Sequence, residues 1–200
     1  YYWLWSRALQ PGYYDHPPMV ALWIAAGTAI AGETPLGIRL LGPIGVAIAS
    51  LLLARAGDDL FPGRQAGRWA ALLLNATLFV GVGAVTMTPD TPLALFWVAT
   101  LWALARLHRS GDAGWWLAVG VFAGAALASK YTALLLGLGI LLWLLWEPTA
   151  RRWFAHWQLW AGGAVALLAF APVIAWNAAH GWVSFAKQGG RTGASEGRAL

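Results

Sequence analysis

The chain has 200 residues, of which 60% are hydrophobic and only 21 are charged: 13 Lys or Arg and 8 Asp or Glu. About a quarter of the residues of a soluble globular protein are charged, so this chain carries too few charges to cover a water-facing surface. The high hydrophobicity also excludes a disordered chain, and the absence of cysteine excludes disulfides and thiolate metal sites. The composition therefore predicts an integral membrane protein.

Residues 1–36 are predicted to form a loop on the outer side of the membrane together with one short helix. Tyrosine and tryptophan are frequent in the first 14 positions, and an apolar segment follows at 17–31. At about 1.5 Å per residue this segment reaches only ~22 Å, which is less than the ~30 Å of a bilayer core. We therefore expect it to lie in the membrane interface.

Residues 37–176 are predicted to form an all-α polytopic bundle of about six membrane-spanning helices. The expected spans lie near 40–56, 69–86, 92–107, 115–128, 131–146 and 159–176. A span needs about 20 predominantly apolar residues, or about 17 at the short end. We divide the long apolar run at Ser129 and Lys130, because a lysine at the centre of a single span would be costly.

The loop arginines predict which side of the membrane each loop faces. Alternate loops are basic, with Arg55, Arg64, Arg68, Arg106, Arg109, Arg151 and Arg152. By the positive-inside rule these loops are cytoplasmic, and both ends of the chain lie outside. The net charge of +5 therefore reflects membrane anchors and does not indicate nucleic-acid binding. Residues 177–200 are interpreted as the truncated start of an outer loop, in a fragment of a longer protein.

Polar side chains collect on the predicted outer side in four short segments. These are YYDHPP at 13–18, MTPDTP at 87–92, SKYT at 129–132 and WNAAHGW at 176–182. A lysine and a histidine beside carboxylates, close to helix ends, suit a ligand that bears a phosphate. Asp15 and His180 are together candidates for holding a divalent cation. The pattern suggests transfer of a group from a lipid-borne phosphate.

Each of these residues also has a plain structural interpretation. Asp90 precedes a helix start and is equally well explained as a helix N-cap. Lys130 is equally well explained as a helix end that faces lipid headgroups, and His180 is more often a surface loop residue than a ligand. Asp15 and His16 precede two prolines, which favours a rigid extended turn.

The order of the motifs resembles that of the membrane-embedded GT-C glycosyltransferases, in the group of the protein O-mannosyltransferases and lipid A aminoarabinose transferases. The matching motifs are YYWLWS, GYYDHPPM, TPDTPL and SKYTALLL, and the resemblance extends to about residue 182. It implies an enzyme that transfers a sugar from a polyprenyl-phosphate donor on the non-cytoplasmic face. The implied acceptor is lipid A, a glycolipid, a polysaccharide or a protein. The implied location is the bacterial inner membrane, with the site facing the periplasm or cell exterior.

The resemblance also implies roles for individual residues. Asp90 and Asp15 are the implied catalytic carboxylates, and Asp15 with His180 is the implied site of a divalent metal. The implied substrate-binding residues are Tyr13, Tyr14, His16, Lys130 and Tyr131. In the family a further acidic motif precedes the segment that resembles Tyr1–Trp3, so another catalytic carboxylate is expected upstream of this chain.

The main alternative is a multi-span transporter or flippase of a lipid-linked or anionic solute. Such a protein would hold its polar groups near the middle of the membrane, on broken helices. The polar residues of this chain gather instead on one predicted side, which favours an enzyme. A purely structural subunit is a third interpretation.

Overall fold

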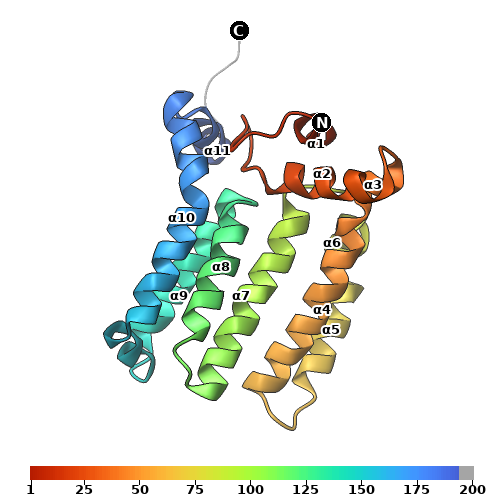
Figure 1. Cartoon of the computed structure of the whole chain (residues 1–200). Helices are drawn as coiled ribbons and strands as arrows, with labels where there is room; N and C mark the ends of the chain where they lie inside the picture. The colour runs from red at the N-terminus through yellow and green to blue at the C-terminus, as the bar shows by residue number, and fades with distance from the viewer. Residues whose placement is uncertain (194–200) are drawn as a thin grey trace.

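The computed structural model describes residues 1–193. Over these residues the chain is helical without strands, which confirms the predicted all-α class. The helices of the bundle are α4 (Leu41–Leu60), α5 (Ala66–Ala76), α6 (Leu78–Gly83), α7 (Asp90–Ser110), α8 (Trp115–Leu127), α9 (Leu134–Trp146) and α10 (Trp157–Ala179). Helices α10, α8, α7 and α4 pack side by side in that order, and α5 packs against α4 (Figure 1).

The N-terminal helices lie at the upper end of this bundle in Figure 1. They are α1 (Tyr2–Ser6), α2 (Met19–Ala31) and α3 (Pro35–Arg39). Helix α2 runs roughly perpendicular to the bundle helices, which is the orientation of a helix that lies along a membrane surface. It occupies most of the segment for which we predict an interfacial position.

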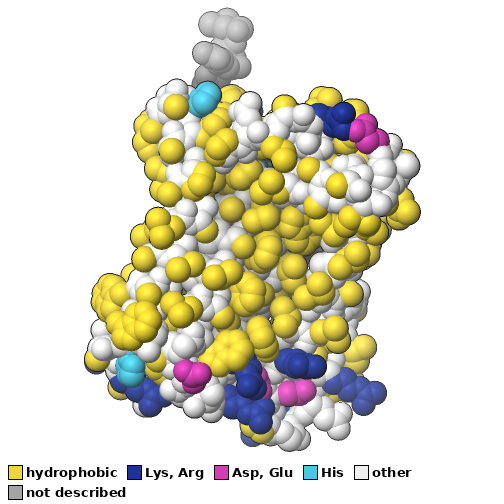
Figure 2. All heavy atoms as spheres, viewed as in Figure 1, with side chains coloured by type: hydrophobic (Ala, Val, Ile, Leu, Met, Phe, Trp, Pro, Cys, Tyr) yellow, Lys and Arg dark blue, Asp and Glu magenta, His cyan; other side chains and the backbone are white. Residues whose placement is uncertain are grey.

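Hydrophobic and charged side chains separate along the bundle. Figure 2 shows hydrophobic side chains over the middle of the molecule, and Lys and Arg gathered at the lower end with several acidic residues among them. A buried cluster supports that end, with Leu107, Trp116, Leu144 and Trp153 in contact. An apolar band bounded by arginines is the surface expected of a membrane protein.

Within residues 1–193, two helical segments are both long and apolar enough to cross a membrane: Pro35–Leu60, which joins α3 to α4, and α10. The predicted count of six spans therefore stays a prediction. The predicted span 69–86 is not one helix in the structure. Thr77 is extended (φ −78°, ψ 140°), and its hydroxyl accepts a hydrogen bond from the Val80 N–H at 3.3 Å. A threonine that caps a new helix in this way interrupts the preceding one.

The long apolar run at 115–146 forms two helices, α8 and α9. Between them Lys130 is extended (φ −158°, ψ 142°), and a 3₁₀ turn, η1 (Tyr131–Ala133), follows it. Lys130 therefore lies at the junction of two helices.

A further helix, α11 (Val183–Gly193), lies in the segment that was expected to begin an outer loop. It follows Gly181 and Trp182, whose φ angles of 66° and 60° turn the chain away from α10. Residues 194–200 of the expected loop lie outside the described residues.

Candidate active site

Asp90 and Lys130 form an ion pair between the start of α7 and the end of α8. The Lys130 Nζ lies 2.7 Å and 2.8 Å from the two carboxylate oxygens of Asp90. Both side chains are partly exposed, Lys130 by 25% and Asp90 by 35%. An ammonium group has three N–H donors, so the pair leaves one donor for a ligand.

The local fold explains why Asp90 is available for this pairing. Pro89 occupies the N-cap position of α7, and no side chain caps the helix there. Asp90 is the first residue of the helix. The turn is closed by Thr91 instead, whose hydroxyl accepts from the Thr88 N–H and donates to the Thr86 carbonyl, each at 3.2 Å. The positive end of the helix dipole also favours a carboxylate here. The N-cap interpretation of Asp90 is therefore wrong.

A cavity of about 450 Å³ adjoins Asp90. Its polar lining is Asp90 with Thr86, Thr88 and Thr91, and its other walls are apolar side chains of α4, α6 and α7. A second cavity of about 480 Å³ shares Thr86 and is lined by Arg39 and the aromatic residues at 1–3. A polar mouth with apolar walls suits the phosphate end of a lipid.

Tyr13 and Tyr14 have different environments. Tyr13 is buried, its ring stacks on Trp5 at 4.2 Å, and its hydroxyl lies 2.9 Å from the Trp5 carbonyl, to which it donates. Burial raises the pKa of the Tyr13 hydroxyl, and a hydrogen bond from the Gln10 backbone partly offsets the rise. Tyr14 is 49% exposed, and the Lys187 ammonium lies 4.6 Å from its ring centroid. Of the two tyrosines, only Tyr14 has a ring open to a ligand.

We expect Tyr13→Phe to change how stability depends on pH. The unfolded chain releases the tyrosine proton near the ordinary pKa of 10.0, whereas the folded protein keeps it to higher pH. The contribution of Tyr13 to the stability of the wild type is therefore fully present below the ordinary pKa. It is lost as the pH rises through the raised pKa of the folded state. In thermal unfolding, Tyr13→Phe should be about 1 kcal/mol less stable at neutral pH and should lose less stability above pH ~10. Parallel pH profiles of the two proteins would contradict this.

Asp15 connects the N-terminal segment to α11. Its Oδ2 accepts a hydrogen bond from the Tyr1 hydroxyl, its Oδ1 lies 3.7 Å from the Lys187 Nζ, and its carbonyl accepts from the Gln188 side chain at 2.6 Å. His16 beside it is buried, with its ring 6.3 Å from that of Tyr2. Both residues are thus held firmly at the outer end of the bundle.

Hydrogen bonds join the predicted outer segments into one site. The Met19 N–H donates to the Ala128 carbonyl at 3.0 Å, which places the segment at 13–18 beside the residues before Lys130. The Asn177 side chain donates to the Tyr131 hydroxyl at 3.3 Å, and the Ser184 hydroxyl donates to the Tyr13 carbonyl. Tyr131 itself is buried against Phe170 and Phe185, so its position favours a supporting role.

Four residues of this site were not predicted from the sequence: Asn177, Ser184, Lys187 and Gln188. Asn177 and Ser184 are fully buried and hydrogen-bonded to each other, from the Ser184 N–H to the Asn177 Oδ1 at 3.2 Å. Ser184, Lys187 and Gln188 follow the i, i+3, i+4 spacing that places side chains on one helix face. That spacing is the feature of the sequence from which a helix with one polar face could be predicted at 183–193.

His180 lies at the C-terminal end of α10. Its ring stacks on Trp176 at 4.0 Å, and its Nδ1 is 2.7 Å from the Trp176 carbonyl oxygen. Within residues 1–193, no group of three or more His, Asp or Glu side chains comes together as a metal site would require. The metal at Asp15 and His180 stays a prediction from the resemblance, and no step proposed below uses it.

Comparisons with known proteins identify the family of the chain. Residues 15–176 match the family model of the dolichyl-phosphate-mannose-protein mannosyltransferases. The chain is 32% identical over 180 residues to the lipid A galacturonosyltransferase RgtD of Rhizobium johnstonii; the match covers 90% of this chain but only 37% of that protein. No solved structure shows a significant match. The resemblance expected from the motifs is confirmed, and the chain belongs to the dolichyl-phosphate-mannose-protein mannosyltransferase family of membrane glycosyltransferases.

Proposed function

We propose that the full-length protein transfers one sugar from a polyprenyl-phosphate donor to an acceptor on the non-cytoplasmic face of the membrane. The observation that carries this proposal is the Asp90–Lys130 pair beside a cavity with apolar walls. An enzyme with a lipid phosphate as leaving group needs a cation at the phosphate and an apolar path for the chain. Membership of a glycosyltransferase family supports the reaction class.

Lys130 is proposed to bind the phosphate of the donor. As the bond between the anomeric carbon and the phosphate oxygen breaks, negative charge grows on the departing lipid phosphate. A preorganised ammonium group stabilises that charge in the transition state more than in the ground state. Asp90 holds Lys130 in place with both carboxylate oxygens, which leaves the third N–H to face the phosphate.

The acceptor hydroxyl is proposed to attack the anomeric carbon from the opposite side, with inversion, and to pass its proton to a carboxylate. Asp15 is one candidate, because its Oδ1 is buried and accepts no hydrogen bond from the residues described. The acidic motif expected upstream is the other candidate. The exposed ring of Tyr14 provides a surface on which a sugar can stack.

The acceptor is proposed to be lipid A or a related glycolipid, in a bacterial inner membrane with the site facing the periplasm. The name of the Rhizobium relative, lipid A galacturonosyltransferase, supports this acceptor and suggests a uronic acid as the sugar. The gathering of arginines at the opposite end of the bundle supports the orientation.

Reconstitution of the full-length protein in liposomes tests the reaction class. With a polyprenyl-phosphate galacturonic acid donor and lipid A supplied on the same side, we expect free polyprenyl phosphate and glycosylated lipid A in equal amounts. Liposomes with lipid A omitted are the control and should release little phosphate lipid. Movement of intact donor across the bilayer without release of polyprenyl phosphate would contradict the proposal and favour a flippase.

A further inference from the structure

The lower end of the bundle contains a polar cavity of about 420 Å³, far from Asp90 and from the two cavities described above. It lies among α4, α7 and the start of α8, and its lining is Arg55, Asp58, Asp59, Trp102, Arg106, Arg109 and Trp115. Helix α7 carries both sites, since Asp90 begins it and Arg106 lies in its last two turns. At about 1.5 Å per residue the two positions are ~24 Å apart along the helix. The cavity therefore has no direct contact with the proposed reaction.

Positive charge exceeds negative charge in this cavity. Asp59 is buried and pairs with two arginines: Arg109 hydrogen-bonds to its Oδ1, and the Arg106 guanidinium lies 3.6 Å from its Oδ2. Asp58 accepts a hydrogen bond from the Gly67 N–H at 3.2 Å. Arg55 is exposed and forms no ion pair with any residue in 1–193. Three guanidinium groups thus face two carboxylates. The Asp59 Oδ2 lies 3.6 Å from Arg106 but accepts no hydrogen bond among the residues described.

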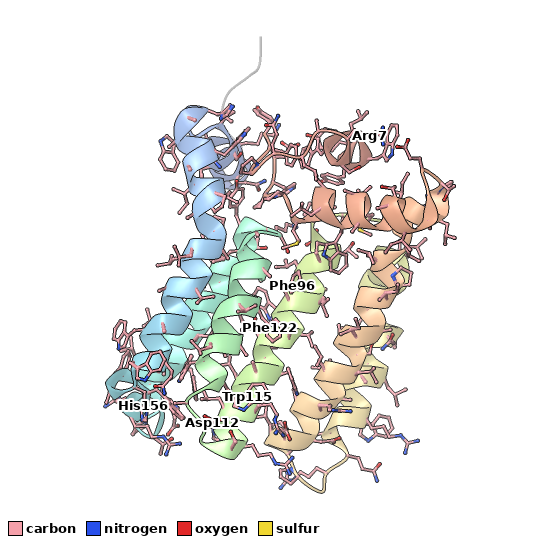
Figure 3. The ribbon with its side chains drawn as sticks, viewed as in Figure 1. Arg7, Phe96, Asp112, Trp115, Phe122 and His156 are labelled. Carbon is pink, nitrogen blue, oxygen red and sulfur yellow. The ribbon has the colours of Figure 1, made fainter. Side chains whose placement is uncertain are left out.

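One donor in the cavity wall lacks an acceptor. The indole N–H of Trp102 is buried and has no hydrogen-bond partner among the residues described. A buried polar group without a partner costs free energy, so such groups in native structures usually bind water, an ion or a ligand. Beside it, the Arg106 guanidinium lies 5.5 Å from the ring centroid of Trp115. Figure 3 shows Trp115 at the lower end of α8.

We propose that this cavity binds the phosphate of an anionic phospholipid. Guanidinium groups bind phosphate oxygens with two parallel hydrogen bonds, and the Trp102 N–H adds a third donor of fixed direction. Arginines gather at this end of the bundle, which the positive-inside rule places in the cytoplasmic leaflet. Basic cavities between membrane helices on that side bind anionic headgroups. The tryptophans at the rim suit the level of the headgroups.

Lipid titration of the purified full-length protein tests the proposal. We expect dioleoyl phosphatidylglycerol, added to the protein in neutral detergent, to raise the unfolding temperature, whereas dioleoyl phosphatidylcholine does not. In Arg55→Gln/Arg106→Gln the half-saturating concentration of phosphatidylglycerol should rise about tenfold, equivalent to about 1.4 kcal/mol. The matched control is Arg151→Gln/Arg152→Gln, which removes the same charge from another loop at the same end and should bind as the wild type does.

Two further variants separate binding from folding. Arg55→Gln alone breaks no ion pair within the described chain and should weaken binding severalfold without changing the unfolding temperature in phosphatidylcholine. Trp102→Phe keeps an aromatic ring at this position but removes the indole donor, and it should weaken binding similarly. Equal affinity in wild type and the double variant, or an equal loss in the control pair, would overturn the proposal. Displacement of phosphatidylglycerol by millimolar inorganic phosphate would overturn it too, by identifying a site for free phosphate.

Discussion

Replacement of Lys130 by methionine in the full-length protein is expected to lower kcat for sugar transfer by about 10²–10³-fold. This is the loss seen when one preorganised donor to a developing anion is removed. Methionine keeps the length and apolar contacts of the side chain but cannot stabilise the departing phosphate. Because the lost interaction is strongest in the transition state, kcat should fall much more than KM rises. The measurement is steady-state release of polyprenyl phosphate.

Asp90→Asn tests whether the pair acts as a unit. The amide keeps the shape of the side chain but removes its charge, so Lys130 loses the partner that holds it with two hydrogen bonds. We expect a loss of at least about tenfold. The double variant should be no worse than Lys130→Met alone, since groups that act together show strongly non-additive effects.

Lys187→Met provides the matched comparison. Lys187 also lies near an outer-side carboxylate, but its Nζ is 3.7 Å from the Asp15 Oδ1, so the pair is looser than Asp90–Lys130. A loss of less than about tenfold is expected there, as for a partly exposed pair. Transfer by Lys130→Met within threefold of the wild-type rate, at normal expression, would show that Lys130 does not bind the leaving group.

Much of this arrangement followed from the sequence, because hydrophobic runs and loop arginines report on helices and membrane sides. The cost of a lysine inside a single span correctly placed a break at Lys130. The positive-inside rule places the segments of Asp90, Lys130 and Asp15 on one predicted side, and the structure connects these segments at one end of the bundle. These inferences depend on local composition, to which each residue contributes independently of the tertiary packing.

The ion pair between Asp90 and Lys130 could not be predicted from the sequence. Asp90 and Lys130 are 40 residues apart, and their contact depends on how α7 packs against α8. Thr77 shows the same limit within one segment, since a threonine is tolerated inside an apolar helix and also favoured as an N-cap. Nothing local decides between the two. Asp90 was open to a capping role for the same reason, until Pro89 was found in the cap position.

Packing of α8 against α10 is expected to be sensitive to any larger residue at the contact. The two backbones approach so closely that a Cβ at Gly120 would lie 2.2 Å from the Gly162 carbonyl oxygen. A Cβ at Gly162 would lie 2.2 Å from the Trp116 carbonyl oxygen. Backbone atoms cannot rotate away as side chains do, so any larger residue must separate the helices. Close approach through small residues is a principal source of helix association in membranes.

Gly162→Leu should therefore destabilise the protein by about 3 kcal/mol or more, at the upper end of the usual cost of overpacking. The control is Gly163→Leu, one residue along α10, where a Cβ meets nothing within 4 Å. It should leave stability unchanged or raise it, because leucine is a better helix former than glycine. Thermal unfolding in detergent, followed by tryptophan fluorescence, measures both variants.

Gly162→Leu should also change the geometry of the active site and lower its activity. Helix α8 leads into Lys130. At the C-terminal end of α10, the Asn177 side chain donates a hydrogen bond to the hydroxyl of Tyr131, the residue after Lys130. Separation of the two helices would shift Lys130 relative to Asp90, and a displacement of about 1 Å can cost an enzyme 10²-fold in rate. We expect Gly162→Leu to lose transfer activity even at temperatures where it stays folded, while Gly163→Leu keeps it. Equal stability and activity in the two variants would mean that α8 and α10 are not packed this closely.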